Sequence, residues 1–225
     1  MANALDLEEQ EQIDAIKHFW NQWGSIITWV LIAVLGAYAG WNGWQYWQRS
    51  QAALAAVLYD EIGRSAQAGD MARLERTLAD LKEQYGSTTY AAQGALAAAS
   101  ALYDKGKLAE AKAALAWAAE KPADDALKAI ARLRLASLQT QEKAYDDALK
   151  TLAGNFPEQF VPLAADRRGD VLLLQGKREQ AVVEFGKAYQ GLGKDSGEYR
   201  RLVGIKLNSL GIDPEAAGTR GGAAS

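Results

Sequence analysis

The sequence predicts an all-α protein in which a single N-terminal transmembrane helix is followed by a solenoid of paired helices. Three observations support this prediction. Residues 23–47 form an uncharged apolar stretch. The rest of the chain is rich in alanine, and the whole chain has only 4 prolines, a composition that favours helix. A pattern of small and large apolar residues also recurs along that part of the chain.

The apolar stretch reads WGSIITWVLIAVLGAYAGWNGWQYW, and no acidic or basic side chain lies between Lys17 and Arg49. About 20 apolar residues are enough for a helix to cross the bilayer core. Tryptophans gather at both ends of the stretch, where indole rings prefer the headgroup region. Residues 37–39, Ala-Tyr-Ala, match a signal-peptide cleavage pattern. However, residues 1–17 are acidic where a signal needs a basic region, so we predict a permanent anchor.

The membrane stretch is preceded by residues 1–22, which we predict to be a short tail with an amphipathic segment. His18, the only histidine, lies beside aromatic residues at the membrane edge, and we interpret it as an interfacial side chain. Basic residues do not favour one side: Lys17 lies before the helix, and Arg49 and Arg64 lie after it. The charge pattern therefore leaves the membrane orientation open.

One face of the membrane helix carries the small residues Gly36, Gly40 and Gly43. Gly36 and Gly40 are four residues apart, a spacing that lets a second membrane helix approach closely. Glycine is also common in membrane helices without such a role. These residues are our candidates for a helix–helix contact in the membrane.

Residues 48–212 contain at least three units in which a helix, a turn and a second helix follow one another. The turns are predicted at residues 105–107, 142–144 and 175–177. A small residue and then a large apolar residue recur in the second helix, and a small residue recurs twelve positions earlier in the first helix. These sets are Ala111, Ala148 and Ala181; Leu115, Leu152 and Phe185; and Ala99, Ala136 and Gly169. Small residues let paired helices pack closely, and the large residue fills the space between them.

Two further segments complete this region. Residues 53–86 fit the same frame, with Gly69 at the turn, and we interpret them as a divergent first repeat, as terminal repeats are often atypical. After Gly197, a helix with Leu202, Val203, Ile205 and Leu210 is predicted to cap the last repeat. Residues 213–225 contain little that could be buried, and we predict a disordered tail.

The sequence offers no catalytic, cofactor or metal signature. It contains no cysteine, no nucleotide-binding loop and no nucleophile elbow, and its net charge of −3 gives no footprint for nucleic acid. The acidic pairs at 124–125 and 146–147 fit helix starts better than a ligand site, because adjacent helical residues point in different directions. We therefore predict a protein that is not an enzyme and needs no cofactor. An enzyme with an unrecognised site is the weakest alternative.

The repeat unit resembles the tetratricopeptide repeat, a helix–turn–helix unit of 34 residues. The whole chain is similar to the YfgM family, ancillary subunits of the bacterial SecYEG translocon. The similar segments, in order, are EQIDAIKHFWNQWG, GWQYWQ, YGSTTYAAQGALAAAS, LKAIARLRLASLQ, AADRRGDVLLLQGKREQA and IKLNSL.

This resemblance implies a single-pass protein of the bacterial inner membrane, with its N-terminus in the cytoplasm and its repeat domain in the periplasm. It also implies association with SecYEG and with a membrane-anchored periplasmic chaperone resembling PpiD. The function it implies is a scaffold that helps pass translocating polypeptides to periplasmic chaperones. The alternative is an assembly scaffold for another envelope complex, such as outer-membrane or division machinery.

A repeat solenoid offers an extended inner groove that can bind a peptide or helix. By analogy with repeat geometry, our candidate partner-binding residues are Gln93, Leu96, Ser100, Tyr103, Leu133, Ser137, Asp166 and Asp170.

Overall fold

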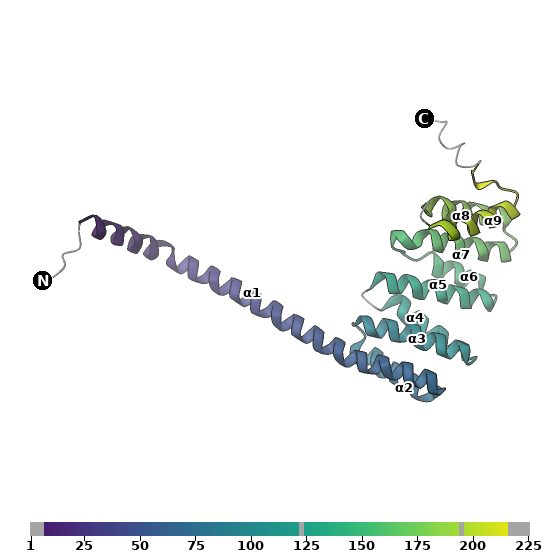
Figure 1. The fold of residues 1–225 in the computed structure, drawn as a ribbon, viewed down its shortest axis with the longest axis horizontal. Coiled ribbons are helices and arrows are strands. Elements are labelled where there is room, and N and C mark those ends of the chain that lie inside the picture. Colours follow the sequence, from purple (N-terminus) through teal and green to yellow (C-terminus); the bar gives the residue numbers. More distant parts are fainter. Residues whose placement is uncertain (1–6, 122–123, 194–195, 216–225) are drawn as a thin grey trace. The chain divides into compact units, whose positions relative to one another are not determined.

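The computed structural model describes residues 7–121, 124–193 and 196–215 (Figure 1). In these ranges all regular structure is helical, which confirms the predicted all-α class. The chain forms two compact units, Met1–Gln51 and Ala52–Ser225. A disordered tail is predicted at residues 213–225. Of this segment, residues 216–225 lie outside the described residues.

The first unit contains most of helix α1, which runs from Leu7 to Ala68. Its apolar stretch is long and apolar enough to cross a membrane, and nearly all of its side chains are exposed. The polar side chains inside the stretch bond to their own helix: Thr28 Oγ1 donates to the Gly24 carbonyl at 2.7 Å, and Asn42 Nδ2 donates to the Tyr38 carbonyl at 2.9 Å. Such internal bonding is what a helix needs in lipid, where water cannot satisfy polar groups.

The second unit stacks helices in the order of the sequence, each packed against the next (Figure 1). The last turns of α1 pair with α2, and three further pairs and a final helix follow, as the predicted repeats require. A short 3-10 helix, η1, leads into α7. The bounds are α2 Met71–Tyr85, α3 Thr89–Asp104, α4 Leu108–Glu120, α5 Asp125–Gln141, α6 Tyr145–Leu152, η1 Glu158–Phe160, α7 Val161–Leu174, α8 Arg178–Gly191 and α9 Gly197–Ser209.

The core of the stack is built from the repeated small and large residues. Ala111, Ala148 and Ala181 are fully buried, as are Leu152 and Phe185. Small side chains let the paired helices approach, and each large side chain then fills the gap between them. The spacing seen in the sequence therefore specifies which residues pack between the helices of this unit.

The acidic pairs begin helices, as the sequence predicts. The Asp124 carboxylate accepts hydrogen bonds from the backbone N–H groups of Ala126 and Leu127 at 2.9 and 3.0 Å, and so caps α5. Asp146 and Asp147 lie in the first turn of α6. A carboxylate at either place offsets the positive end of a helix dipole.

The first helix of each pair ends in a left-handed residue followed by a tight backbone bond. At the α3–α4 turn, Gly106 has φ of 74°, and the Lys107 N–H donates to the Leu102 carbonyl at 2.9 Å. This is a Schellman motif, which suits glycine because glycine has no Cβ to clash. The α5–α6 turn has the same bond, from the Ala144 N–H to the Gln139 carbonyl at 2.8 Å, but its left-handed residue is Lys143 with φ of 63°.

Replacing Lys143 with glycine is expected to stabilise the repeat domain by about 1 kcal/mol. A left-handed non-glycine residue costs roughly 1–2 kcal/mol, and the extra entropy of glycine in the unfolded chain returns part of that gain. Thermal unfolding of the full chain in detergent, followed by circular dichroism, measures the change. The control is Lys105→Gly, because Lys105 precedes a turn glycine and has φ of −93°, so it should lower the melting temperature. A melting temperature for Lys143→Gly at or below that of the unmodified chain would contradict the prediction.

Helix α9 caps the stack, but with a different face from the predicted one. Val203, Leu207 and Leu210 are buried against α8, at the i, i+4 and i+7 spacing of one helix face. Leu202 and Ile205, which we expected to pack with them, are 47% and 58% exposed. At 3.6 residues per turn, Leu202 lies about 100° and Ile205 about 160° around the helix from the buried face, so that part of the prediction is wrong.

Candidate binding groove

The first helices of consecutive pairs, α3, α5 and α7, pack directly against one another. In each of these helices, the residue that follows the buried small residue is polar, and its side chain is exposed or half-buried. These residues are Ser100, Ser137 and Asp170. The repeat therefore places equivalent side chains in a row along one side of the stack.

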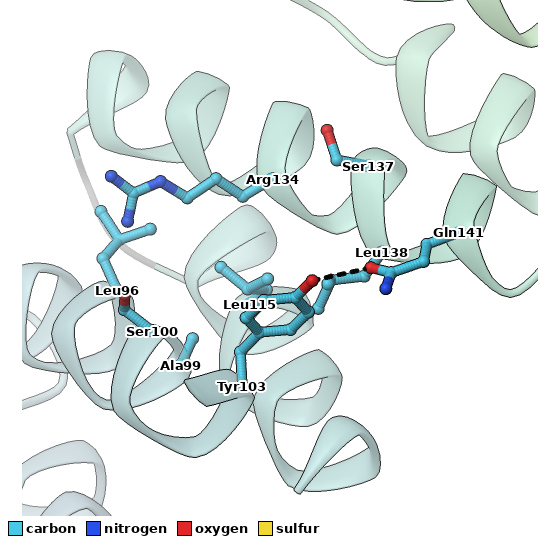
Figure 2. A pocket seen from close by; sticks show the side chains of 9 residues that line it. All are labelled: Leu96, Ala99, Ser100, Tyr103, Leu115, Arg134, Ser137, Leu138 and Gln141. Carbon is cyan, nitrogen blue, oxygen red and sulfur yellow. Dashed lines mark hydrogen bonds between the residues drawn. The ribbon is translucent and has the colours of Figure 1, made fainter. Parts of the chain in front are cut away.

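A hollow on this side lies between α3 and α5 and has a volume of about 280 Å³ (Figure 2). Its floor and walls are mostly apolar, and its polar groups are two hydroxyls, a phenol, an amide and a guanidinium. The lining residues are Leu96, Ala99, Ser100, Tyr103, Leu115, Arg134, Ser137, Leu138 and Gln141. A concave apolar surface with a few polar groups is typical of a binding pocket.

Two polar side chains on α5 mark opposite ends of this α3/α5 pocket. At one end the Tyr103 hydroxyl donates to Gln141 Oε1 at 3.0 Å, which joins α3 to α5 (Figure 2). Arg134 lies two helical turns before Gln141, about 10 Å along the helix axis, and extends at the other end. An occupant would therefore meet a neutral hydrogen-bonded end and a cationic end.

Further hollows lie on either side of this pocket along the stack. Ser137 also lines a hollow of about 220 Å³ between α5 and α7, together with Thr140, Arg167 and Asp170. On the other side, a hollow of about 390 Å³ lies between the end of α1 and Ala97 of α3. We use the term inner groove for these three hollows.

A family model described as "Tetratricopeptide repeat-like domain" matches residues 17–212. Three relatives named "Ancillary SecYEG translocon subunit" match along nearly their whole length. The protein of Neisseria gonorrhoeae is 31% identical over 92% of this chain and 99% of its own, and that of Escherichia coli is 32% identical over 91% and 97%. The protein of Haemophilus influenzae is 30% identical over 92% and 100%.

The chain belongs to the YfgM family. The resemblance drawn from the sequence is thereby confirmed, and so is the repeat class of the second unit. As a YfgM-family member, the chain combines a helix able to span a membrane with a tetratricopeptide-like domain.

Five of the eight candidate partner-binding residues of this YfgM-family chain line the inner groove. Leu96, Ser100, Tyr103 and Ser137 line the α3/α5 pocket, and Asp170 lines the next hollow. The structure thus brings together side chains from three helices.

The other three candidates lie elsewhere. Gln93 is exposed on α3 outside the lining of these three hollows. Leu133 is half-buried and packs against the core cluster around Leu152. Asp166 requires a correction, because its side chain is 1% exposed and offers no free surface to a partner.

Asp166 instead joins the capping helix to the last repeat. Tyr199 donates to Asp166 Oδ2 at 2.7 Å, and Lys206 Nζ donates to Asp166 Oδ1 at 2.8 Å. Lys206 also donates to both Asp170 oxygens, at 2.7 and 2.9 Å. Two carboxylates of α7 therefore share one ammonium group of α9, which fixes the end of the groove.

Burial of this cluster changes how its members titrate. Desolvation raises the pKa of Asp170 above its usual value, although the hydrogen bond from Lys206 acts in the opposite direction. Desolvation also raises the pKa of the Tyr199 phenol, and the hydrogen bond to Asp166 adds to this effect. The Tyr199 hydroxyl therefore stays protonated and acts as a donor near neutral pH.

Of the two cations of the groove, Arg134 and Arg167, sequence reasoning missed Arg134. They lie 33 residues apart at equivalent positions of α5 and α7, two residues before Ala136 and Gly169. The repeat spacing could have revealed Arg134, had basic residues been aligned in the same way as the small ones. Thr140 and Gln141 were missed for the same reason.

Within the described ranges, no group of three or more His, Asp or Glu side chains could hold a metal ion. In the membrane helix, a Cβ added to Gly36, Gly40 or Gly43 would meet no other atom within 4 Å. That face therefore has room for a neighbouring helix.

Proposed function

We propose that this protein is a membrane-anchored interaction scaffold associated with the Sec translocon, and that it is not an enzyme. The observation that carries the proposal is the match to relatives named ancillary SecYEG translocon subunits, which extends over 92% of the chain. The inner groove supports it physically, because distributed apolar and polar contacts along a solenoid suit a polypeptide ligand.

The finer proposal is that the groove receives translocating polypeptides and a membrane-anchored chaperone resembling PpiD, and so helps pass polypeptides to periplasmic chaperones. The membrane helix would raise the effective concentration of the groove beside such partners. This role requires the N-terminus in the cytoplasm and the repeat domain in the periplasm. The Gly36, Gly40 and Gly43 face would contact a partner helix in the bilayer.

Photo-crosslinking in cells tests the proposal. A photoreactive amino acid at Ser137, which lines two hollows, is expected to crosslink to translocon components, the chaperone or a translocating chain. The matched control is Lys150 on α6, whose side chain is 80% exposed and lies outside the lining of the three hollows, so it should give no such product. Protease should reach the repeat domain once the outer membrane is opened.

Crosslinks from Ser137 to outer-membrane or division proteins alone would favour the envelope-assembly alternative. Equal products from Ser137 and Lys150 would show that the groove is not the contact surface. Digestion of the repeat domain only from the cytoplasmic side would defeat the export role.

A further inference from the structure

Among the described residues that line the α3/α5 pocket, Arg134 is the one cation and none is acidic. Arg134 is exposed, and the hydrogen bonds and ion pairs among the described residues include none made by its guanidinium. By contrast, Lys206 at the far end of the groove is held by two carboxylates. A guanidinium beside an apolar wall is a strong site for a carboxylate, because it can donate two parallel hydrogen bonds.

The apolar part of the pocket lies within reach of that guanidinium. Leu96, Leu115 and Leu138 come from three successive helices and line the hollow, and Ala99 leaves its floor open. Figure 2 shows the Arg134 guanidinium on the same side of the pocket as Leu96. An occupant with an apolar side chain next to a carboxylate would satisfy both features together.

The helices that form the pocket also line a hollow on either side of it. Ser137 links it to the α5/α7 hollow, and α3 links it to the hollow beside α1. An occupant that follows this surface continues past the pocket on both sides, as an internal segment does and a chain end does not. The Ser100 and Ser137 hydroxyls can form hydrogen bonds with the backbone of such a segment.

A second cation occupies the equivalent place one repeat later. Arg167 is half-exposed and lies 3.6 Å from Asp170 Oδ2, but that carboxylate is already held by Lys206 at 2.7 Å. Packed helices lie about 8–10 Å apart. An extended chain in the polyproline II conformation has three residues per turn and rises about 3.1 Å per residue, so side chains three positions apart lie on one side and cover that distance.

We propose that the α3/α5 pocket binds an internal, extended polypeptide segment in which a large apolar side chain lies beside an Asp or Glu that pairs with Arg134. A second acidic residue three positions along meets Arg167. This inference rests on the proposed scaffold function and names the chemistry that its groove selects.

The test uses the full chain in detergent micelles and short fluorescent peptides with both termini blocked. One peptide carries a central leucine with two glutamates three residues apart. Matched peptides replace glutamate with glutamine, or leucine with serine. Fluorescence anisotropy gives the affinities, and the glutamate peptide is expected to bind about tenfold more tightly than the glutamine peptide. Its binding should weaken as ionic strength rises.

Arg134→Gln is expected to abolish the preference for glutamate and to leave binding of the glutamine peptide unchanged. The matched control is Arg76→Gln, because Arg76 is exposed on α2 and its one hydrogen bond within the described part of the chain goes to the Ala72 carbonyl of its own helix. It should retain the tenfold preference. Equal behaviour of the two variants overturns the inference.

The remaining outcomes separate this inference from the scaffold function. If glutamate and glutamine peptides bind the unmodified chain equally, the charge preference is overturned, and a peptide-binding groove still stands. One further peptide ends in leucine with a free C-terminal carboxylate. If only this peptide binds, the internal-segment assignment is overturned in favour of a chain end. If no peptide binds, the inference is overturned, and crosslinking from Ser137 still decides the scaffold function independently.

Discussion

Replacing Lys206 with methionine is expected to destabilise α9 by about 3–5 kcal/mol. The substitution removes the ammonium group that two carboxylates share, one of them 1% exposed, and leaves only the half-exposed Arg167 guanidinium 3.6 Å from Asp170 Oδ2. Breaking a buried ion pair is costly for this reason, whereas forming one yields little net stability. Because α9 covers buried residues of α8, its loss would also expose the apolar core around Phe185.

Hydrogen exchange of the α9 amides measures this change, since repeat proteins open locally and not as one unit. The matched control is Lys187→Met. Lys187 Nζ lies 2.6 Å from Glu184, but its side chain is 59% exposed, so the expected loss is at most about 1 kcal/mol. Adding Asp166→Asn and Asp170→Asn to Lys206→Met should recover much of the stability, because the buried charges are then gone.

The loss in Lys206→Met should depend on pH in a defined direction. Burial already raises the pKa of Asp170, and removing Lys206 removes a hydrogen bond that lowers it. The folded state then binds more protons than the unfolded state between the unfolded pKa and the folded pKa, so stability falls as pH rises through that range. The cost of the substitution should therefore shrink as pH is lowered from about 7 to about 4. A cost that is constant with pH would show that lost packing, and not unpaired charge, causes it.

Replacing Phe185 with alanine is expected to cost about 3–5 kcal/mol of local stability in α7 and α8. Phe185 is fully buried and fills the space that Gly169 leaves on the facing helix. A Cβ at Gly169 would lie only 2.5 and 2.6 Å from two ring atoms of Phe185. Gly169→Ala should therefore cost about 1–3 kcal/mol through overpacking.

The combination of Gly169→Ala with Phe185→Leu tests whether the two positions form one packing unit. The smaller side chain makes room for the added methyl group, so the double variant should lose less stability than the sum of the single variants. Hydrogen exchange of α7 and α8 reports the change. Simple additivity of the two losses would contradict direct coupling between these positions.

Most of the fold could be predicted from the sequence because its determinants are local and periodic. The turn at Gly106, the small residues at Ala111 and Ala148 and the uncharged stretch at 23–47 each act over a few residues. The periodic pattern is not strict at Lys143, where the same turn forms although its left-handed residue is lysine and not glycine. Tertiary packing supplies the stability that this residue costs.

The candidate site was predicted less completely. Leu96, Ser100, Tyr103 and Ser137 were found because a repeat places equivalent residues on one side of the stack. Asp166 was assigned to the groove by the same rule, yet it is buried beneath Tyr199 and Lys206, which lie 33 and 40 residues further along the chain.

The sequence by itself determined the helical class, the positions of the turns, the membrane stretch and the side of each helix that packs within its own repeat. These features follow from helical periodicity and backbone conformation, which neighbouring residues set. Only the tertiary structure decided which carboxylates are buried, which face of α9 covers the core and which arginine of the groove has no ion pair among the described residues. Those outcomes depend on distances between residues far apart in the chain, and burial and charge pairing act through such distances.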